Sequence, residues 1–287
     1  MIWPYRRSTE AHQYEQDNPP MKKILLAIAI AGAVAACATT TSPTGRTQNV
    51  GGISQQQLDQ MGQQAFAEYK SKLPRSTNRA QTAYVACVVN SLTRELPSAN
   101  QAGWEFALFN DDSPNAFALP GGKIGVNTGI LKVAKTQDQL AAVIAHEIGH
   151  VISRHHDERL TRQIGAQTGL GLVGALLGSQ YGSGAQQTTQ QVGGALVQGV
   201  FLLPNSRTQE SEADVVGQRL MAQAGFDPQQ AVSLWENMIS ASSGNPPEWL
   251  STHPDPRSRI AELRNRAGSL AGTYQQARSS GRKPTCG

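Results

Sequence analysis

Apolar residues recur at three- and four-residue intervals over 136–151, a spacing that places side chains on one face of a helix. Thr136 begins a capping-box pattern at the start of this segment, and no proline occurs over 136–203. A second helical pattern covers 210–221 and stops at Gly225, a residue type that commonly follows the last turn of a helix. The sequence therefore predicts two well-defined helices in the middle of the chain.

The remaining segments predict a mostly helical α+β fold. One domain is expected over 55–267, which is long enough for a sizeable core, followed by a tail over 268–287. In chain order we expect helices at 54–73 and 77–96, a strand at 104–109, two short strands within 115–126, the two helices above with a Gly-rich segment between them, and two closing helices.

Short extended runs alternate with turn residues over 115–126. The run 117–119 is followed by Pro120-Gly121-Gly122 and then by the run 123–126. This pattern predicts a pair of strands at the edge of a sheet. An ordinary hairpin that covers the core is the alternative.

The first central helix carries the sequence His146-Glu147-Ile148-Gly149-His150. Residues four apart share a helix face, so both imidazoles can reach one metal ion while Glu147 lies near the same edge. Two nitrogen ligands with a neighbouring carboxylate base are typical of a zinc hydrolase. The alternative is a surface helix with two unrelated histidines. Gly149 would allow another backbone to pack close to the metal.

A zinc site needs a third protein ligand, and the second central helix offers one. Glu210 and Asp214 lie four residues apart and share a helix face. Glu210 can ligate the metal, while Asp214 can accept the second N–H of a ligand histidine or hold a neighbouring base. A solvated acidic helix start, favoured by the helix dipole, is the alternative and fits Glu212 well.

His155 and His156 follow too closely after His150 to return to the same metal ion. Together with the neighbouring charged residues, they are expected on the exposed polar side of the helix. They are therefore not part of the predicted ligand set.

Four ordered motifs over residues 55–267 resemble the gluzincin metallopeptidases of the HtpX and CAAX-prenyl-protease type. Within that family the chain is most similar to the periplasmic BepA/LoiP-like lipoprotein branch. The motifs are the segment 113–122 with 124–129, the H-E-x-x-H sequence, Glu210 with Asp214, and 251–254 with Arg259. The resemblance implies a zincin-like domain that has a small edge sheet over the active-site helix and binds one Zn²⁺ per chain.

The resemblance also implies roles for residues outside the ligand set. The edge strand would pair with an extended substrate backbone, as in β-augmentation. His253 would either stabilise the oxyanion or occupy the open metal position in a resting form, and Arg259 would support this loop or the oxyanion. The residues expected at the substrate are therefore Asn115, Ala116, Phe117, Ala118 and Arg259.

The segment 165–200 is rich in Gly, Ala and Gln. Its apolar run 170–177 is much shorter than the roughly 20 residues that a membrane-spanning helix needs. We therefore expect a mobile helical hairpin beside the active site, whose role the sequence leaves open.

The N-terminal region resembles a bacterial lipoprotein signal. Residues 21–36 combine a short basic start with an apolar run, and Cys37 ends a lipobox-like sequence. The expectation is a lipidated Cys37, a polar tether over 37–54, and a periplasmic protein anchored to the inner leaflet of the outer membrane. Residues 1–20 are expected to be a non-native or mis-started extension before Met21.

Cys87 and Cys286 remain in the mature chain. An oxidising compartment would let them pair and clamp the C-terminal tail onto the helix around 84–89. Equally, Cys87 could be a small core residue and Cys286 a free thiol. The net charge of +4 is modest, and no basic stripe with interleaved aromatic residues indicates a nucleic acid partner.

The sequence thus predicts a zinc-dependent endopeptidase of the bacterial cell envelope that acts on misfolded or unassembled proteins. Glu147 would be the general base of the hydrolysis. The expected partners are polypeptide substrates, the outer-membrane lipid and possible outer-membrane assembly proteins. The main alternative is a periplasmic chaperone or assembly factor that binds extended polypeptide with little or no proteolysis.

Overall fold

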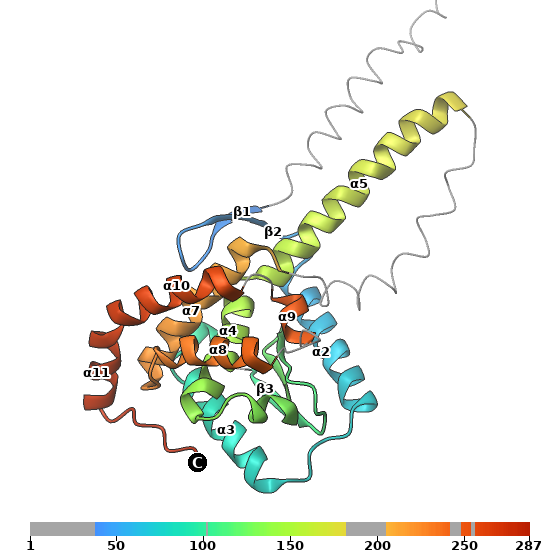
Figure 1. Cartoon of the computed structure of the whole chain (residues 1–287). Helices are drawn as coiled ribbons and strands as arrows, with labels where there is room; N and C mark the ends of the chain where they lie inside the picture. Colours follow the sequence, from blue (N-terminus) through green and yellow to red (C-terminus); the bar gives the residue numbers. More distant parts are fainter. Residues whose placement is uncertain (1–37, 102, 182–204, 242–247, 254–255) are drawn as a thin grey trace, which may run out of the picture.

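The computed structural model describes residues 38–101, 103–181, 205–241, 248–253 and 256–287, and it has the expected mostly helical α+β fold (Figure 1). Its helices are α2 (Gln55–Lys72), α3 (Arg79–Thr93), α4 (Gln137–Ile152), α5 (His155–Tyr181), α7 (Arg207–Ala224), α8 (Gln230–Ala241), α9 (Glu248–Thr252), α10 (Pro256–Ser269) and α11 (Ala271–Ser279), with the short 3-10 helices η1 (Ser98–Asn100) and η2 (Thr128–Lys132).

A three-stranded sheet lies beside α4 and has the order β3-β5-β4. Its strands are β3 (Glu105–Phe109), β4 (Ala116–Leu119) and β5 (Lys123–Asn127). β3 pairs in parallel with β5, and β4 pairs antiparallel with β5 through the register Ala116 to Val126. Among the described strands β4 therefore has a neighbour on one side only, which confirms the expected strand pair at a sheet edge.

The helix α4 lies in the core and crosses α7 at close range. Its residues 139–150 are all buried, so this helix has no solvated face over that stretch. A Cβ atom on Gly149 would lie 2.8 Å from the carbonyl oxygen of Ala213, and one on Gly217 would lie 3.0 Å from the backbone nitrogen of His146. Two glycines, one on each helix, thus permit the close approach, as expected for Gly149.

The chain turns sharply after α4. Ser153 ends the helix, and Arg154 has a φ of 54°, the left-handed region that non-glycine residues seldom adopt. A new helix, α5, begins at His155 in a different direction. The expectation that His155 and His156 lie on the exposed side of one continuous helix is therefore wrong, because the turn brings both imidazoles into the interior.

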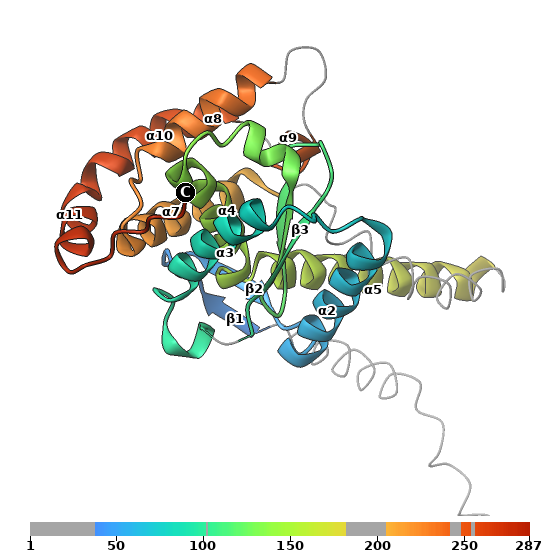
Figure 2. The same ribbon diagram turned by 90° about the horizontal axis from the view of Figure 1, so that it is seen from below.

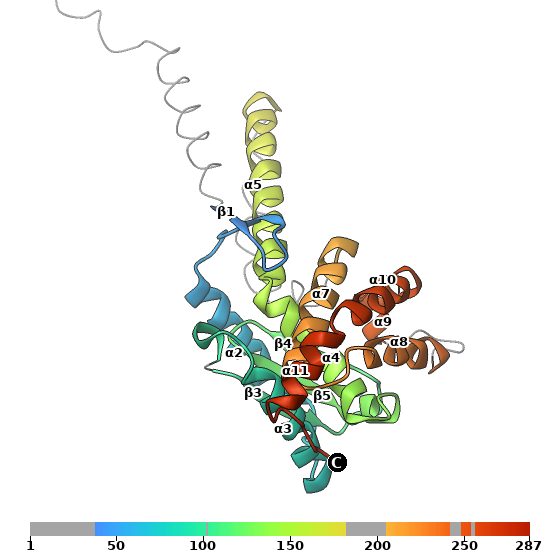
Figure 3. The same ribbon diagram turned by 90° about the vertical axis from the view of Figure 1, so that its left-hand side faces the viewer.

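The N-terminal segment after residue 37 is also more structured than expected. Strands β1 (Ala38–Thr41) and β2 (Thr47–Val50) form an antiparallel hairpin, and β2 lies against α5 (Figure 3). The polar tether predicted over 37–54 is therefore largely a folded hairpin. Charged side chains explain the difference, since Arg46 in the turn pairs with Glu158 and Glu212 of the helical body.

The C-terminal segment predicted as a tail is part of the domain. It forms α11 and then runs back to α3, where Cys286 makes a disulfide with Cys87 (Figure 2). Gln137 at the start of α4 donates to the Pro284 carbonyl and accepts from the Cys286 N–H, both at 2.8 Å. The disulfide alternative is thus confirmed, and the segment fixes the beginning of α4.

Several expectations lie wholly or partly outside the described residues. They include the extension over 1–20, the signal over 21–36 and the lipidation site Cys37. The first part of the Gly-rich segment is helical as the end of α5, which runs outward from the body (Figure 1). Within the described residues, no helix combines the length and hydropathy needed to cross a membrane.

We predict that replacing both cysteines by serine lowers the free energy of unfolding by about 2–5 kcal/mol, because the unfolded chain regains the freedom that the crosslink removes. The bond joins residues 199 positions apart, which makes the closed loop long. Urea unfolding without reductant measures the effect. Wild-type protein treated with reductant should unfold like the double variant, and an unchanged midpoint would contradict the prediction.

Candidate metal centre

Two histidines on α4 point the same ring nitrogen into one buried site. The Nε2 atoms of His146 and His150 lie 3.0 Å apart. Their Nδ1 atoms are occupied elsewhere, by Asp214 and by His155 respectively. A neutral imidazole carries one proton, so a proton on each Nδ1 leaves each Nε2 with a free lone pair. Both residues therefore present ligand atoms toward the same point.

Glu210 on α7 completes this cluster. Its carboxylate oxygens lie 3.4 Å from His146 Nε2 and 3.3 Å from His150 Nε2, and its side chain is fully buried. Donor atoms held tetrahedrally at roughly 2.0–2.1 Å from a zinc ion stand about 3.3–3.4 Å apart. The observed separations of 3.0–3.4 Å thus fit a metal ion at the centre of the three residues.

Buried polar atoms support the same conclusion. Glu210 Oε1 and His253 Nε2 have no hydrogen-bond partner although both are inaccessible to solvent. Such unsatisfied atoms are costly unless something absent from the protein chain satisfies them. His253 belongs to the group of four residues whose ligand atoms lie within 4.8 Å of one another. The donor types suit a divalent transition metal, with zinc the expected ion.

Asp214 holds the first ligand histidine. Its Oδ1 atom accepts from His146 Nδ1 at 3.0 Å, one of the two roles expected for this residue. Arg259 on α10 donates to both Asp214 oxygens at 2.6 and 2.7 Å and also to Glu210 Oε2. The guanidinium group stacks on the Trp235 ring at 4.0 Å. Arg259 thus fixes the carboxylates on α7.

This position corrects the expectation for Arg259. Its side chain is only 4% exposed, and its donors are directed at Asp214 and Glu210 rather than at the pocket. The structure therefore does not bring Arg259 to the predicted substrate position. Sequence spacing from His253 could place the arginine near the site but not tell which side of the ligands it occupies.

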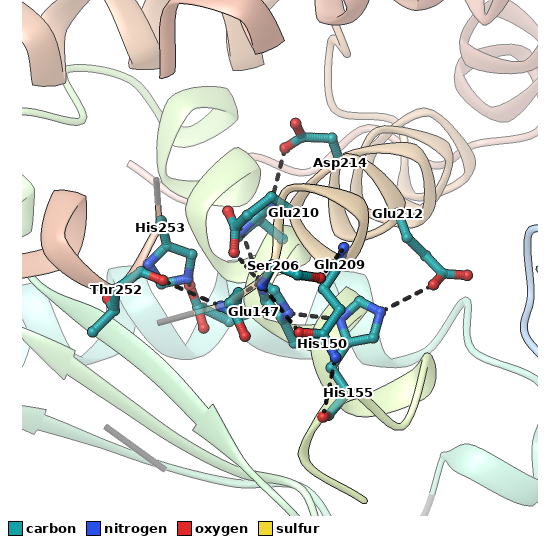
Figure 4. Close-up of polar contacts among 12 residues, drawn as sticks. Glu147, His150, His155, Ser206, Gln209, Glu210, Glu212, Asp214, Thr252 and His253 are labelled. Atoms are coloured by element: carbon teal, nitrogen blue, oxygen red, sulfur yellow. Dashed lines mark hydrogen bonds and ion pairs between the residues drawn. The ribbon is translucent and has the colours of Figure 1, made fainter. Parts of the chain in front are cut away.

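The second ligand histidine is held by a longer chain of contacts. His150 Nδ1 lies 2.7 Å from His155 Nδ1, and His155 Nε2 lies 3.1 Å from Glu212 Oε2 (Figure 4). Glu212 is buried and pairs with Arg46 of the N-terminal hairpin. The expectation of a solvated Glu212 is therefore wrong, because its partners come from segments distant in sequence.

Glu147 lies beside the cluster without being one of its three ligands. Trp249 Nε1 donates to its Oε1 atom at 3.0 Å, and His253 Nε2 lies 3.2 Å from the same oxygen. Burial alone would raise the pKa of Glu147, but His253, His146 and the Trp249 hydrogen bond outweigh it and lower the pKa. The carboxylate is thus ionised and able to accept a proton.

The two ligand histidines differ in basicity. In the metal-free protein burial lowers the pKa of His146, yet hydrogen bonds to Asp214 and Glu210 outweigh it and raise the pKa to about 9, so a bound metal ion displaces a proton from Nε2. Burial dominates for His150 and holds its pKa well below the usual value. The difference follows from the carboxylate that His146 Nδ1 contacts directly, whereas His150 Nδ1 contacts another imidazole.

A pocket lies between the edge strand and the metal-ligand cluster. Predicted substrate residues from Asn115 to Ala118 line it, as do Glu147, His150 and His253. Sequence reasoning missed several further lining residues, among them Tyr69, Arg159 and Asn205. Arg159 donates to Asn205, and the Asn205 amide nitrogen lies 3.4 Å from His150 Nε2. No local pattern identifies these residues, since they meet only after folding.

We predict that Arg259→Met lowers the free energy of unfolding by about 3–5 kcal/mol, because it leaves two buried carboxylates without their cation. Arg264→Met on the same helix is the matched control. Its pair with Glu236 is more than half exposed on both sides, so the cost should stay below about 1 kcal/mol. Urea unfolding of both variants without metal measures their free energies of unfolding. A small and equal decrease for the two variants would contradict the prediction.

Comparison with known proteins agrees with this geometry. The mitochondrial metalloendopeptidase OMA1 of Schizosaccharomyces pombe is 36% identical over 210 residues, covering 71% of this chain and 59% of that protein. The beta-barrel assembly-enhancing protease of Escherichia coli is 32% identical over 224 residues, covering 74% and 44% respectively. OMA1 of Saccharomyces cerevisiae is 33% identical over 182 residues, covering 61% and 50%. The chain thus spans about half the length of these curated relatives.

The model of peptidase family M48 matches residues 79–267. This range includes both helices that supply the cluster and the segment that carries His253. The match extends over more than half of the chain and confirms the resemblance that the motifs predicted. The chain belongs to peptidase family M48.

Proposed function

We propose that the protein is a zinc-dependent endopeptidase of the bacterial cell envelope. The observation that carries the proposal is the convergence of His146, His150 and Glu210, with the ionised Glu147 carboxylate beside them. Family membership supports the same reaction class. A zinc ion, when bound there, polarises the scissile carbonyl and lowers the pKa of a water molecule.

Glu147 performs the proton transfers in this proposal. Its ionised carboxylate takes a proton from the attacking water molecule and returns it to the leaving amine. Trp249 keeps the carboxylate in place through its Nε1–H bond, and Asp214 keeps the His146 ring in the orientation that leaves Nε2 free. The role of each side chain follows from the atom it contacts.

The edge strand β4 is the proposed docking site for the substrate backbone. Its residues line the same pocket as Glu147, and its outer edge has no described strand beside it. An extended peptide added to this edge would make main-chain hydrogen bonds and lie along the catalytic groups. Such recognition depends little on side chains, which suits misfolded or unassembled polypeptides as substrates.

His253 fits the role of a resting ligand better than that of an oxyanion donor. Its Nδ1 atom lies 2.9 Å from the Trp249 carbonyl, so in the neutral ring that metal binding requires, the one proton lies on Nδ1. The Nε2 atom then has only a lone pair to offer to the cluster. We therefore infer that His253 occupies the open metal position until substrate displaces it.

The proposed compartment is the periplasm, with a lipid anchor at Cys37 that holds the protein at the outer membrane. The Cys87–Cys286 disulfide supports an oxidising compartment, because such bonds are rare in the bacterial cytoplasm. Similarity to the beta-barrel assembly-enhancing protease suggests outer-membrane assembly proteins as substrates or partners.

We predict that Glu147→Gln lowers the rate of casein cleavage by about 10²–10⁴-fold while the protein still binds one zinc ion. The amide keeps the shape of the side chain but cannot accept the proton. Zinc content by atomic emission and cleavage by gel assay are the two measurements. Glu262→Gln on the exposed surface of α10 is the control and should cleave normally.

Addition of a chelator should abolish cleavage by the wild-type protein, and zinc should restore it. Normal cleavage by the Glu147→Gln variant would refute the proposed mechanism. Prevention of casein aggregation by a wild-type protein that shows no cleavage would instead favour the chaperone alternative.

We predict that His253→Ala raises the rate of casein cleavage several-fold, because the substrate no longer competes with the imidazole for the open position. Thr252→Val, which removes only the hydroxyl next to the His253 ring, is the matched variant and should change the rate less. Initial rates at low substrate concentration measure both. A fall in rate for His253→Ala would assign the residue to oxyanion stabilisation.

A further inference from the structure

An unbroken line of side chains joins the candidate ligand His150 to the N-terminal hairpin. His150 contacts His155, His155 contacts Glu212, and Glu212 contacts Arg46 in the turn between β1 and β2. The successive distances are 2.7, 3.1 and 2.9 Å. His155 is 0% exposed and Glu212 is 4% exposed, so these contacts are protected from water.

The direction of each hydrogen bond follows from the ligand role of His150. If Nε2 offers its lone pair to a metal, the one proton of the neutral ring must lie on Nδ1. His150 then donates to His155 Nδ1, so the His155 proton lies on Nε2 and is donated to Glu212. The acceptor at the end of this chain is a carboxylate oxygen of Glu212, which also contacts the Arg46 guanidinium group.

The hairpin supplies the partners that keep Glu212 in place. Thr44 donates to Glu212 Oε1 at 2.6 Å, while Arg46 Nε donates to Oε2 at 2.9 Å. Among the described residues, Arg46 is the arginine or lysine that forms an ion pair with Glu212. A second carboxylate, Glu158, accepts from both terminal nitrogens of Arg46 at 2.9 Å and orients the guanidinium group.

We propose that the N-terminal hairpin completes the metal centre, with Arg46, Glu212 and His155 as positioning residues for the His150 ring. The inference rests on the proposed function to the extent that a metal binds at His150. The hairpin lies outside the segment matched by the family model, so family membership does not assign it this role. Loss of the contact between Arg46 and Glu212 weakens metal binding, because Glu212 then no longer holds the His155 ring in the position from which it accepts from His150.

A Glu158 variant distinguishes an effect of hairpin docking on metal binding from an effect on the orientation of the His150 ring. Glu158 accepts from Arg46 as Glu212 does, but among the described residues its carboxylate accepts no hydrogen bond from the ring of His155 or His150; Gln209 Nε2 lies between Glu158 and the backbone carbonyl of His155 only. Glu158→Gln therefore disturbs the same arginine without interrupting the line of contacts to His150. It is the matched control for Glu212→Gln.

The test is zinc affinity of the full chain, measured by competition with a chromogenic chelator. We expect Glu212→Gln, Arg46→Met and His155→Phe to weaken zinc binding by about 10–100-fold, the usual effect of losing a partner of a ligand histidine. Glu158→Gln should weaken it less than about threefold. Arg46→Lys keeps the charge and should recover part of the loss seen for Arg46→Met.

Cobalt supplies a second measurement that a purely structural role would not change. With Co²⁺ in place of zinc, the visible spectrum depends on ligand geometry, so His155→Phe and Arg46→Met should shift it while Glu158→Gln should not. Arg46 is partly exposed, so Arg46→Met is expected to fold even if a core variant does not. Thermal unfolding of the variants without metal shows whether each of them is folded.

Zinc affinity and a cobalt spectrum unchanged in Arg46→Met and Glu212→Gln would overturn the inference while leaving the proposed peptidase intact. Equal losses for Glu158→Gln and Glu212→Gln would also overturn it, because docking alone would then explain the effect. Failure of the wild-type chain to bind zinc or cobalt would refute the metal centre and the inference together.

Discussion

The close crossing of α4 and α7 is the constraint on which the site depends. The backbone carbonyl of Ala213 approaches Gly149 so nearly that a Cβ atom would lie 2.8 Å from it. Ala213 stands between Glu210 and Asp214, the two carboxylates that face His146. Any side chain at Gly149 would push the helices apart, and the 3.3–3.4 Å separations between Glu210 and the histidines would be lost. Packing thus sets the geometry of the ligands.

The site also requires cations that compensate the charge of its buried carboxylates. Glu147, Glu210 and Asp214 are buried together, and two buried guanidinium groups, Arg259 and Arg159, lie among them. Three carboxylates against two guanidinium groups leave an excess of negative charge, which in the metal-free protein is offset by a proton on His146, whose pKa is raised to about 9. A divalent cation removes this excess. The same charges that would destabilise the metal-free fold therefore favour metal binding.

The local sequence was sufficient to predict the metal ligands, but not the residues that hold the ligands in place. The four-residue spacing of His146 and His150, and of Glu210 and Asp214, follows directly from helix geometry. The turn at Arg154 carries no Gly, Pro or Asn signal, so the burial of His155 and His156 was not predictable. Glu212 finds Arg46 across 166 residues, a pairing that exists only in the folded chain.

The two ligand histidines are supported in different ways, and the difference has a physical reason. His146 donates directly to a carboxylate, which raises its pKa to about 9, whereas His150 donates to a neutral imidazole and has a lowered pKa. A carboxylate directly on His150 would add a fourth negative charge to the ligand cluster. His155 instead transmits the orienting hydrogen bond while keeping the Glu212 charge one ring further away, next to Arg46. The arrangement fixes both rings without adding to the buried charge excess at the metal.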